Sequence, residues 1–273
     1  MLSDPMNCPS MDYFSLSLQQ LALITNKLDE AIAGRKLPLL PSFLHSFPTG
    51  REEGTFLGVD FGGTFFKFGL FTFNSSKKEY VNCKPFVQIP IPEWLKKASG
   101  KTLFEFIAKA TMEFVGEGCS KEQPLKMGFT FSYPTRQTSL SQGFLLKWAK
   151  DIECEGVVGS DVVALLQHEL DSLSGGAIQV CALLNDTVAA IMAYKYANPN
   201  VSVGCIFGTG TNGAYISSSC NEAINTEWGS FWNNVLPVTE ADIQVDNASL
   251  YPDFPIDPQE AVDLLQAADF LDL

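Results

Sequence analysis

Apolar positions along the 273 residues follow two different periods, which predicts a chain of mixed helices and strands. Helical spacing predicts helices over residues 14–33, 101–115, 161–173 and 187–197. Short apolar runs bounded by turn residues predict strands over residues 55–59, 65–73, 85–91, 125–131, 180–184, 201–207 and 214–217. Helices and strands that intermix in this way are typical of an α/β fold.

Two segments interrupt this pattern. Polar residues, glycine and proline between Ser132 and Asp151 predict a long loop, and long loops inside compact domains often carry function. After Trp232 the chain is acidic and rich in proline, and helical spacing returns only over residues 258–273. From Asn234 onward there are nine acidic residues and no basic one, so most of the net charge of −13 belongs to this tail.

Composition argues against several classes of function. The net charge of −13 argues against a nucleic-acid-binding protein. The longest apolar runs are too short for a membrane-spanning helix, and residues 1–10 lack the basic and apolar regions of a secretory signal. The seven cysteines form no C-x-x-C pair, which predicts buried free thiols in a reducing, cytoplasmic compartment. The two histidines, His45 and His168, lack the spacing of metal ligands.

A glycine-rich turn between two predicted strands, Asp60-Phe-Gly-Gly-Thr64, is a candidate phosphate site. Gly62 and Gly63 allow close approach of the backbone to a phosphate, and Thr64 offers a hydroxyl. Asp60 can hold Mg²⁺ through water. The same residues also suit an ordinary hairpin turn. The triplet Asp-Phe-Gly is typical of protein kinases, but the sequence has no His-Arg-Asp, so we exclude that class.

A second glycine-rich segment, Gly208-Thr-Gly210-Thr-Asn-Gly213, follows another predicted strand. It satisfies the G-x-G-x-x-G pattern of dinucleotide-binding proteins, but that site requires a helix to begin there. The residues after Gly213 predict a strand instead. The pattern therefore favours a hairpin that grips phosphate, with a plain glycine turn as the alternative and a nicotinamide enzyme as a third possibility.

Four further polar residues could carry chemistry. Asp186 ends an apolar strand and begins a helix, where it is either a helix cap or a general base at a sheet edge. Ser132 and Lys150 lie in the predicted loop, where they could bind sugar oxygens or phosphate, or simply lie on the surface. Glu227 stands beside Trp228, a pairing that suits carbohydrate but also an exposed strand end.

Over about residues 12–245, the order and spacing of these motifs resemble the eukaryotic hexokinase/glucokinase family. The resemblance is carried by Asp60-Phe-Gly-Gly-Thr64, by Phe129-Thr-Phe-Ser-Tyr-Pro134 with Gln137, Gly143, Trp148 and Lys150, by Asn185-Asp186, by Gly208-Thr-Gly-Thr-Asn212 and by Asn225-Thr-Glu-Trp-Gly229. It implies an α/β fold of the two-lobed actin/hexokinase-like (ribonuclease-H-like) type. Residues 1–52 and 186–245 would then belong to the large lobe, residues 53–185 would form the small lobe, and residues 246–273 would be an acidic tail without family resemblance. We expect the large lobe to be incomplete.

The resemblance also implies an activity, the ATP-dependent phosphorylation of a hexose at its 6-hydroxyl, with glucose as the first candidate beside mannose and fructose. Asp186 would be the general base and Lys150 the second catalytic residue. The sugar would be held by Ser132, Pro134, Lys150, Asn185, Asp186, Asn212 and Glu227. The nucleotide phosphates would be held by Asp60, Gly62, Gly63, Thr64, Gly208, Thr209 and Gly210, with Asp60 also serving Mg²⁺.

Three substitutions depart from the family pattern. Phe65 stands where the family usually has a polar residue after the first glycine turn, Ala149 lacks a sugar-contacting hydroxyl, and Asp151 replaces a glycine. The alternative is therefore a catalytically impaired hexokinase-like fragment or a sugar-responsive regulator. The oligomeric state cannot be predicted from these motifs.

Overall fold

The computed structural model describes residues 15–76, 79–116, 119–208, 210–231, 235–240, 243–244 and 247. The chain divides into two compact units, one of residues 39–229 and one that combines residues 1–38 with residues 230–273. The helix predicted over residues 258–273 lies outside the described part. The lobe boundaries expected from the resemblance stay a prediction.

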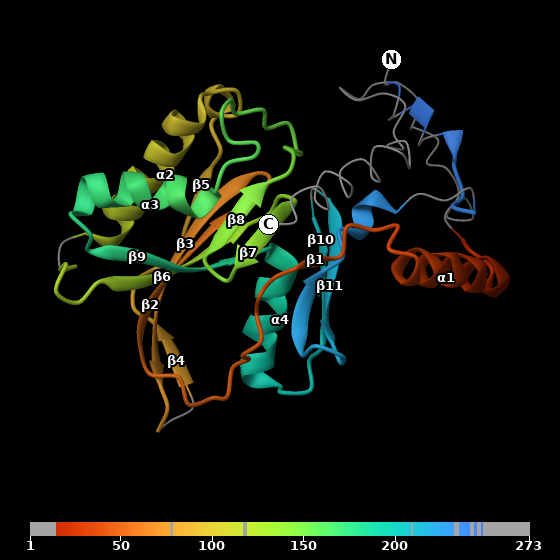
Figure 1. Ribbon diagram of the computed structural model, residues 1–273, viewed down its shortest axis with the longest axis horizontal. Helices are drawn as coiled ribbons and strands as arrows, with labels where there is room; N and C mark the ends of the chain where they lie inside the picture. The colour runs from red at the N-terminus through yellow and green to blue at the C-terminus, as the bar shows by residue number, and fades with distance from the viewer. Residues whose placement is uncertain are drawn as a thin grey trace, which may run out of the picture. The chain divides into compact units, whose positions relative to one another are not determined.

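A six-stranded sheet forms the larger part of the 39–229 unit, with the order β4-β3-β2-β6-β9 and β5 also paired to β3 (Figure 1). Its strands are β2 (Gly54–Phe61), β3 (Phe65–Asn74), β4 (Glu79–Asn82), β5 (Val87–Pro90), β6 (Leu125–Phe131) and β9 (Ile178–Leu184). β2, β6 and β9 run parallel, so their carboxyl ends lie at the same edge of the sheet. Residues that follow these three strands are therefore brought together.

Two helices, α2 (Gly100–Val115) and α3 (Val162–Ser174), lie side by side against this sheet (Figure 1). Ser99 caps α2 and Asp161 caps α3 through side-chain oxygens that accept backbone N–H bonds. The core between helices and sheet is fully buried and dominated by phenylalanine, including Phe61, Phe66, Phe68, Phe104, Phe129 and Phe131. This closely packed core fixes the positions of the strands, and so of the residues at their carboxyl ends.

A second, antiparallel sheet has the order β1-β12-β11-β10. Its strands are β1 (Leu40–Pro41), β10 (Val203–Phe207), β11 (Thr211–Ser217) and β12 (Glu222–Asn225). Helix α4 (Asp186–Ala197) starts directly after β9 and packs on this second sheet. Close packing depends on Gly204, where a Cβ would lie 2.6 Å from the carbonyl oxygen of Thr187. α4 thus carries the chain from the first sheet to the second.

In the other unit, α1 spans Leu18–Ala33. The predicted helix was expected from residue 14, but Ser17 and Gln20 form a capping box that defines the start. Two short 3₁₀ helices also occur, η2 (Glu93–Leu95) within the 39–229 unit and η3 (Trp228–Ser230) at its end. No helix among the described residues is long and apolar enough to cross a membrane.

The prediction of a long loop between Ser132 and Asp151 is wrong. The segment contains an antiparallel hairpin, β7 (Thr135–Ser139) and β8 (Gln142–Leu145). β7 has no apolar residue to signal a strand, but its Gln137 side chain donates to the Leu183 carbonyl at 3.0 Å. In β8, a Cβ at Gly143 would lie 2.5 Å from the Leu183 side chain. The hairpin is therefore pressed against β9, a tertiary contact that local sequence does not show.

The prediction also missed β1, β4 and β12, and it misplaced the thiols. β12 is buried along its whole length although it contains Glu222 and Asn225, and such polarity hides a strand. Cys154 is a buried free thiol as expected, but Cys83, Cys205 and Cys220 are exposed.

Candidate sugar and phosphate site

The carboxyl edge of the first sheet gathers residues from three strands. The first glycine turn follows β2, Ser132 follows β6, and Asn185 and Asp186 follow β9. The backbone N–H of Ser132 donates to the carbonyl oxygen of Phe61 at 3.1 Å, which links the ends of β6 and β2. The parallel register thus brings together residues that are more than 120 positions apart.

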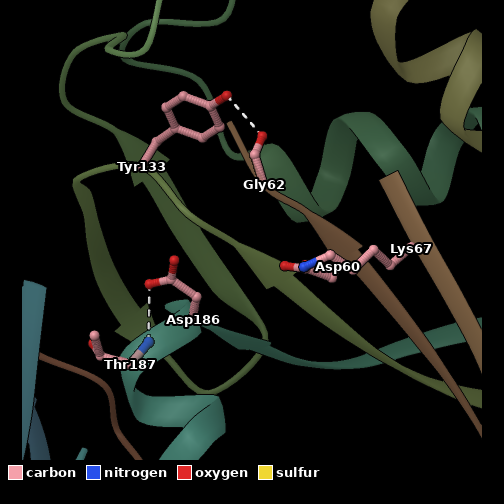
Figure 2. Close-up of polar contacts among 6 residues, drawn as sticks. All are labelled: Asp60, Gly62, Lys67, Tyr133, Asp186 and Thr187. Carbon is pink, nitrogen blue, oxygen red and sulfur yellow. Dashed lines mark hydrogen bonds and ion pairs between the residues drawn. The ribbon is translucent and has the colours of Figure 1, made fainter. Parts of the chain in front are cut away.

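The first glycine turn is tied to the strand ends by hydrogen bonds. The Gly62 N–H donates to the Phe65 carbonyl at 3.1 Å, and the Tyr133 hydroxyl donates to the Gly62 carbonyl at 3.1 Å (Figure 2). The Tyr133 ring is buried among Phe61, Phe131 and Trp148. Thr64 is exposed at the turn. The hydrogen bonds therefore fix the conformation of the turn, and Thr64 stays accessible to solvent.

Asp60 is a partly buried carboxylate beside this turn. Its Oδ2 forms an ion pair with Lys67 Nζ at 2.9 Å, across the β2–β3 pair. Its Oδ1 is buried without a hydrogen-bond partner among the described residues. Burial raises the pKa of Asp60, as does the nearby Asp186 carboxylate more weakly, although Lys67 and Lys150 lower it. Asp60 points toward the side on which Asp186 lies (Figure 2).

Lys150 lies between the two glycine-rich turns. A Cβ at Gly63 would be 2.7 Å from Lys150 Cδ, and a Cβ at Gly210 would be 4.0 Å from Lys150 Cε. The ammonium donates to the Ser132 carbonyl at 2.9 Å and lies 5.4 Å from the centre of the Tyr133 ring. A cation held at this point is placed to neutralise negative charge between the turns.

Lys150 and Asp151 both have left-handed backbones, with φ of 59° and 62°. A Cβ is strained in this region, so we expect Asp151→Gly to be more stable to urea than Asp151→Ala by about 1 kcal/mol. Both substitutions remove the carboxylate, so the difference isolates the backbone. The control is Asp171 in α3, where the order reverses because glycine is about 1 kcal/mol worse than alanine inside a helix. Equal stabilities of the two Asp151 variants would contradict the expectation.

The start of α4 presents Asn185 and Asp186. Asn185 is buried, and its Oδ1 accepts from the Thr187 backbone N–H at 3.0 Å, from the Thr187 hydroxyl at 2.6 Å and from Asn212 Nδ2 at 3.3 Å. Asp186 Oδ1 accepts from the same Thr187 N–H at 2.9 Å, and its other oxygen points away from the helix (Figure 2). Asn185 is therefore the helix cap, which leaves Asp186 available for chemistry.

Two strands of the second sheet add an amide and carboxylate network. Asn212 Nδ2 donates to Asn225 Oδ1 at 2.9 Å and lies 3.4 Å from Glu227 Oε1. Asn225 Nδ2 donates to the same Glu227 oxygen at 2.7 Å. Desolvation raises the pKa of Glu227, while the bond from Asn225 lowers it. Together with Asn185, this network offers the directional donors and acceptors that sugar hydroxyls require.

The second glycine turn is a tight hairpin between β10 and β11. The Gly208 N–H donates to the Gly210 carbonyl at 2.9 Å, and Thr209 lies outside the described residues. Gly213 is needed for packing, because a Cβ there would lie 2.6 Å from the Trp228 ring. A strand rather than a helix follows this turn, so the dinucleotide-binding alternative is wrong.

Most of the predicted site residues thus lie around one region of the 39–229 unit. Pro134 stabilises the β7–β8 hairpin, since its carbonyl accepts from the Leu146 N–H at 3.0 Å. Sequence reasoning gave no role to Tyr133, Gln137 or Asn225. Gln137 Nε2 donates to the carbonyls of Leu183 at 3.0 Å and Ser42 at 3.2 Å, which fastens the hairpin beside Asn185. The spacing of Asn225 and Glu227, two positions apart at a strand end, was the signal available for Asn225.

Comparison with known proteins agrees with this geometry. A family model described as Hexokinase matches residues 9–196, and a second model of the same description matches residues 202–256. The chain belongs to the hexokinase family. The family and the actin/hexokinase-like α/β fold predicted from the motifs are therefore confirmed.

Several hexokinases are similar over most of this chain. Hexokinase-2 of Candida albicans is 36% identical over 89% of the chain and 55% of its own length. Hexokinase-1 of Arabidopsis thaliana is 38% identical over 80% of the chain and 47% of its own length. The structure of a Schistosoma mansoni hexokinase complexed with glucose matches 88% of the chain and 59% of its own, with 31% identity and a TM-score of 0.77. The chain spans about half the length of the curated relatives it matches.

Proposed function

We propose that this chain binds a hexose, with glucose as the first candidate, and transfers the terminal phosphoryl group of ATP to its 6-hydroxyl. The observation that carries the proposal is the convergence of Asn185, Asp186, Asn212 and Glu227 from two sheets around the start of α4. The similar Schistosoma hexokinase was solved with glucose, which supports a hexose as the ligand.

In the proposed reaction, Asp186 accepts the proton of the 6-hydroxyl as that oxygen attacks the terminal phosphorus. The new oxygen–phosphorus bond forms as the bond to the leaving ADP breaks. A base fixed in place in this way contributes about 10²–10⁴-fold to the rate. Asn185, Asn212 and Glu227 orient the sugar, and Ser132 lies at the adjoining strand end.

On the nucleotide side, Lys150 and the two glycine turns would neutralise and hold the phosphates. Asp60 fits a role toward Mg²⁺, since its buried Oδ1 lacks a hydrogen-bond partner among the described residues. No cluster of three or more metal-ligating side chains occurs within the described ranges, and Mg²⁺ in such sites commonly uses one carboxylate with water and phosphate. When bound, the ion would supply charge neutralisation at the phosphates.

The direct test is to incubate the purified chain with glucose, Mg²⁺ and ATP and to measure glucose 6-phosphate. Calorimetry with glucose and with ATP is run on the same preparation, and mannose and fructose serve as comparison sugars. We expect glucose binding together with product formation above a no-protein blank. Absence of glucose binding would overturn the proposal.

The second candidate is a sugar-binding protein without catalysis. It is favoured by the ion pair that already occupies Asp60 Oδ2 and by Phe65, an aromatic residue beside the phosphate turn. In that case calorimetry would detect glucose but not ATP, and no product would form.

A further inference from the structure

Asn225 occupies an unusual place for an amide side chain. It is 4% exposed, and its backbone pairs with Ala214 of β11 on one side and Leu40 of β1 on the other. A buried polar side chain costs free energy unless it is hydrogen-bonded, so its retention in the middle of a sheet calls for a set of partners. Those partners are the two proposed sugar-binding residues Asn212 and Glu227.

The two ends of the Asn225 amide have different tasks. Its Oδ1 accepts from Asn212 Nδ2 at 2.9 Å, the shortest of the three contacts of that nitrogen. Its Nδ2 donates to Glu227 Oε1 at 2.7 Å. A carboxylate could not donate this second bond, and a hydrocarbon could make neither. The Gly213 N–H donates to Asn212 Oδ1 at 2.7 Å, so it and Asn225 together fix which way the Asn212 amide faces. Asn225 also fixes where the Glu227 carboxylate lies.

Asn225 also supports the backbone at Glu227, which has a left-handed φ of 49°. The Glu227 N–H lies 3.4 Å from Asn225 Oδ1, and the Thr226 hydroxyl donates to the Gly213 carbonyl at 2.7 Å. The turn after β12 is thus held at both ends, and the Asn225 side chain is the part of this support that contacts the Glu227 carboxylate.

From these contacts we infer that Asn225 is a positioning residue for hexose binding, which aligns Asn212 and Glu227 for the sugar hydroxyls without being a ligand itself. The inference rests on the proposed hexose site and goes beyond it, since it assigns the alignment of that site to a buried residue. It predicts a specific response to charge, because an added carboxylate at position 225 would contact the Glu227 carboxylate.

The test is Asn225→Asp, with glucose binding measured by calorimetry at about pH 5 and about pH 8. Two carboxylates in contact cannot both ionise freely, so one of them keeps its proton at about pH 5, where an isolated carboxyl group has mostly lost it, and gives it up before about pH 8. While the introduced carboxyl group is protonated, its hydroxyl can donate to Glu227 as the amide did. We expect affinity within about threefold of the native protein at the lower pH, and a loss of about tenfold or more at the higher pH, where the donor is gone and the charges repel.

Charged groups around position 225 and Glu227 do not change the expectation that glucose affinity falls as the pH rises. Asp186 raises the pKa of Glu227, while Lys150 and Lys147 lower it, and all three are unchanged in the variant. The matched control is Asn200→Asp, which adds the same charge at an exposed position and should leave the pH profile of glucose binding as it is in the native chain. Thermal unfolding at both pH values shows whether each variant is folded.

Three outcomes would overturn the inference: native affinity of Asn225→Asp at the higher pH, an equal loss at both pH values, or the same profile in Asn200→Asp. If Asn225→Asp does not fold, Asn225→Ser decides, because one hydroxyl cannot replace both bonds and affinity should fall about tenfold. Native affinity in that variant would also overturn it. Failure of the unaltered chain to bind glucose would instead contradict the proposed function.

Discussion

Replacing Asp186 with asparagine is expected to lower the rate of hexose phosphorylation by about 10²–10⁴-fold, while glucose affinity stays within a few-fold. The amide oxygen of the variant can still accept from the Thr187 N–H, so the start of α4 keeps its geometry. What is lost is the capacity to accept a proton from the 6-hydroxyl. The measurement is kcat from glucose 6-phosphate formation, with the glucose dissociation constant from calorimetry.

The control for this substitution is Asp161→Asn. Asp161 caps α3, and its Oδ1 accepts from the backbone N–H groups of Val163 and Gly143 at 3.0 and 3.3 Å. It is thus another aspartate at the start of a helix, but it lies outside the proposed site. We expect its variant to keep the native kcat. A comparable loss in both variants would show that folding rather than proton transfer was affected, and native kcat in Asp186→Asn would exclude Asp186 as the base.

Much of this fold could be predicted because its first sheet has strong local signals. β2, β3, β6 and β9 are apolar runs bounded by glycine or polar residues, and their neighbouring helices have clear 3.6-residue periods. The candidate site followed from the same signals, because Asp60, Ser132 and Asp186 each stand directly at a strand end. Parallel pairing then brings those ends together.

The other strands and site residues could not be predicted, because they depend on tertiary contacts. β7 is polar and is held in place by the bond from Gln137 to the Leu183 carbonyl, and β12 keeps Glu222 and Asn225 buried among other strands. The bond from Tyr133 to Gly62 joins positions 71 apart, so nothing local announces it. Asn225 had a local signal in its two-residue spacing from Glu227, but that spacing does not reveal its second partner, Asn212 on β11.

Replacing Asp60 with asparagine is expected to lower activity and to raise stability. Asp60→Asn should lower magnesium-dependent phosphorylation by about 10²–10³-fold, because the carboxylate proposed to serve the ion is lost. The same change should raise the free energy of unfolding near neutral pH. Lys67, left without the ion pair, is 41% exposed and can be hydrated.

The sign of the stability effect follows from the pKa of Asp60, which burial raises above its ordinary value of 3.8. The folded state then binds the proton more tightly than the unfolded state, so native stability falls as pH rises from 3.8 through the raised pKa and stays lower above it. Asparagine does not titrate, so its advantage in urea unfolding should be small at acid pH and full near neutral pH.

A matched carboxylate–lysine pair gives the contrasting case. Glu105 is paired with Lys109 at 2.6 Å on the exposed face of α2, and this bond lowers the pKa of Glu105. Glu105→Gln should therefore give no gain at neutral pH and leave kcat unchanged, since exposed pairs contribute little. If Asp60→Asn were less stable than the native chain near neutral pH, the ion pair with Lys67 would outweigh the cost of burial. The partly buried Asp60 carboxylate would then serve the fold, and its assignment to the nucleotide side would lose its physical basis.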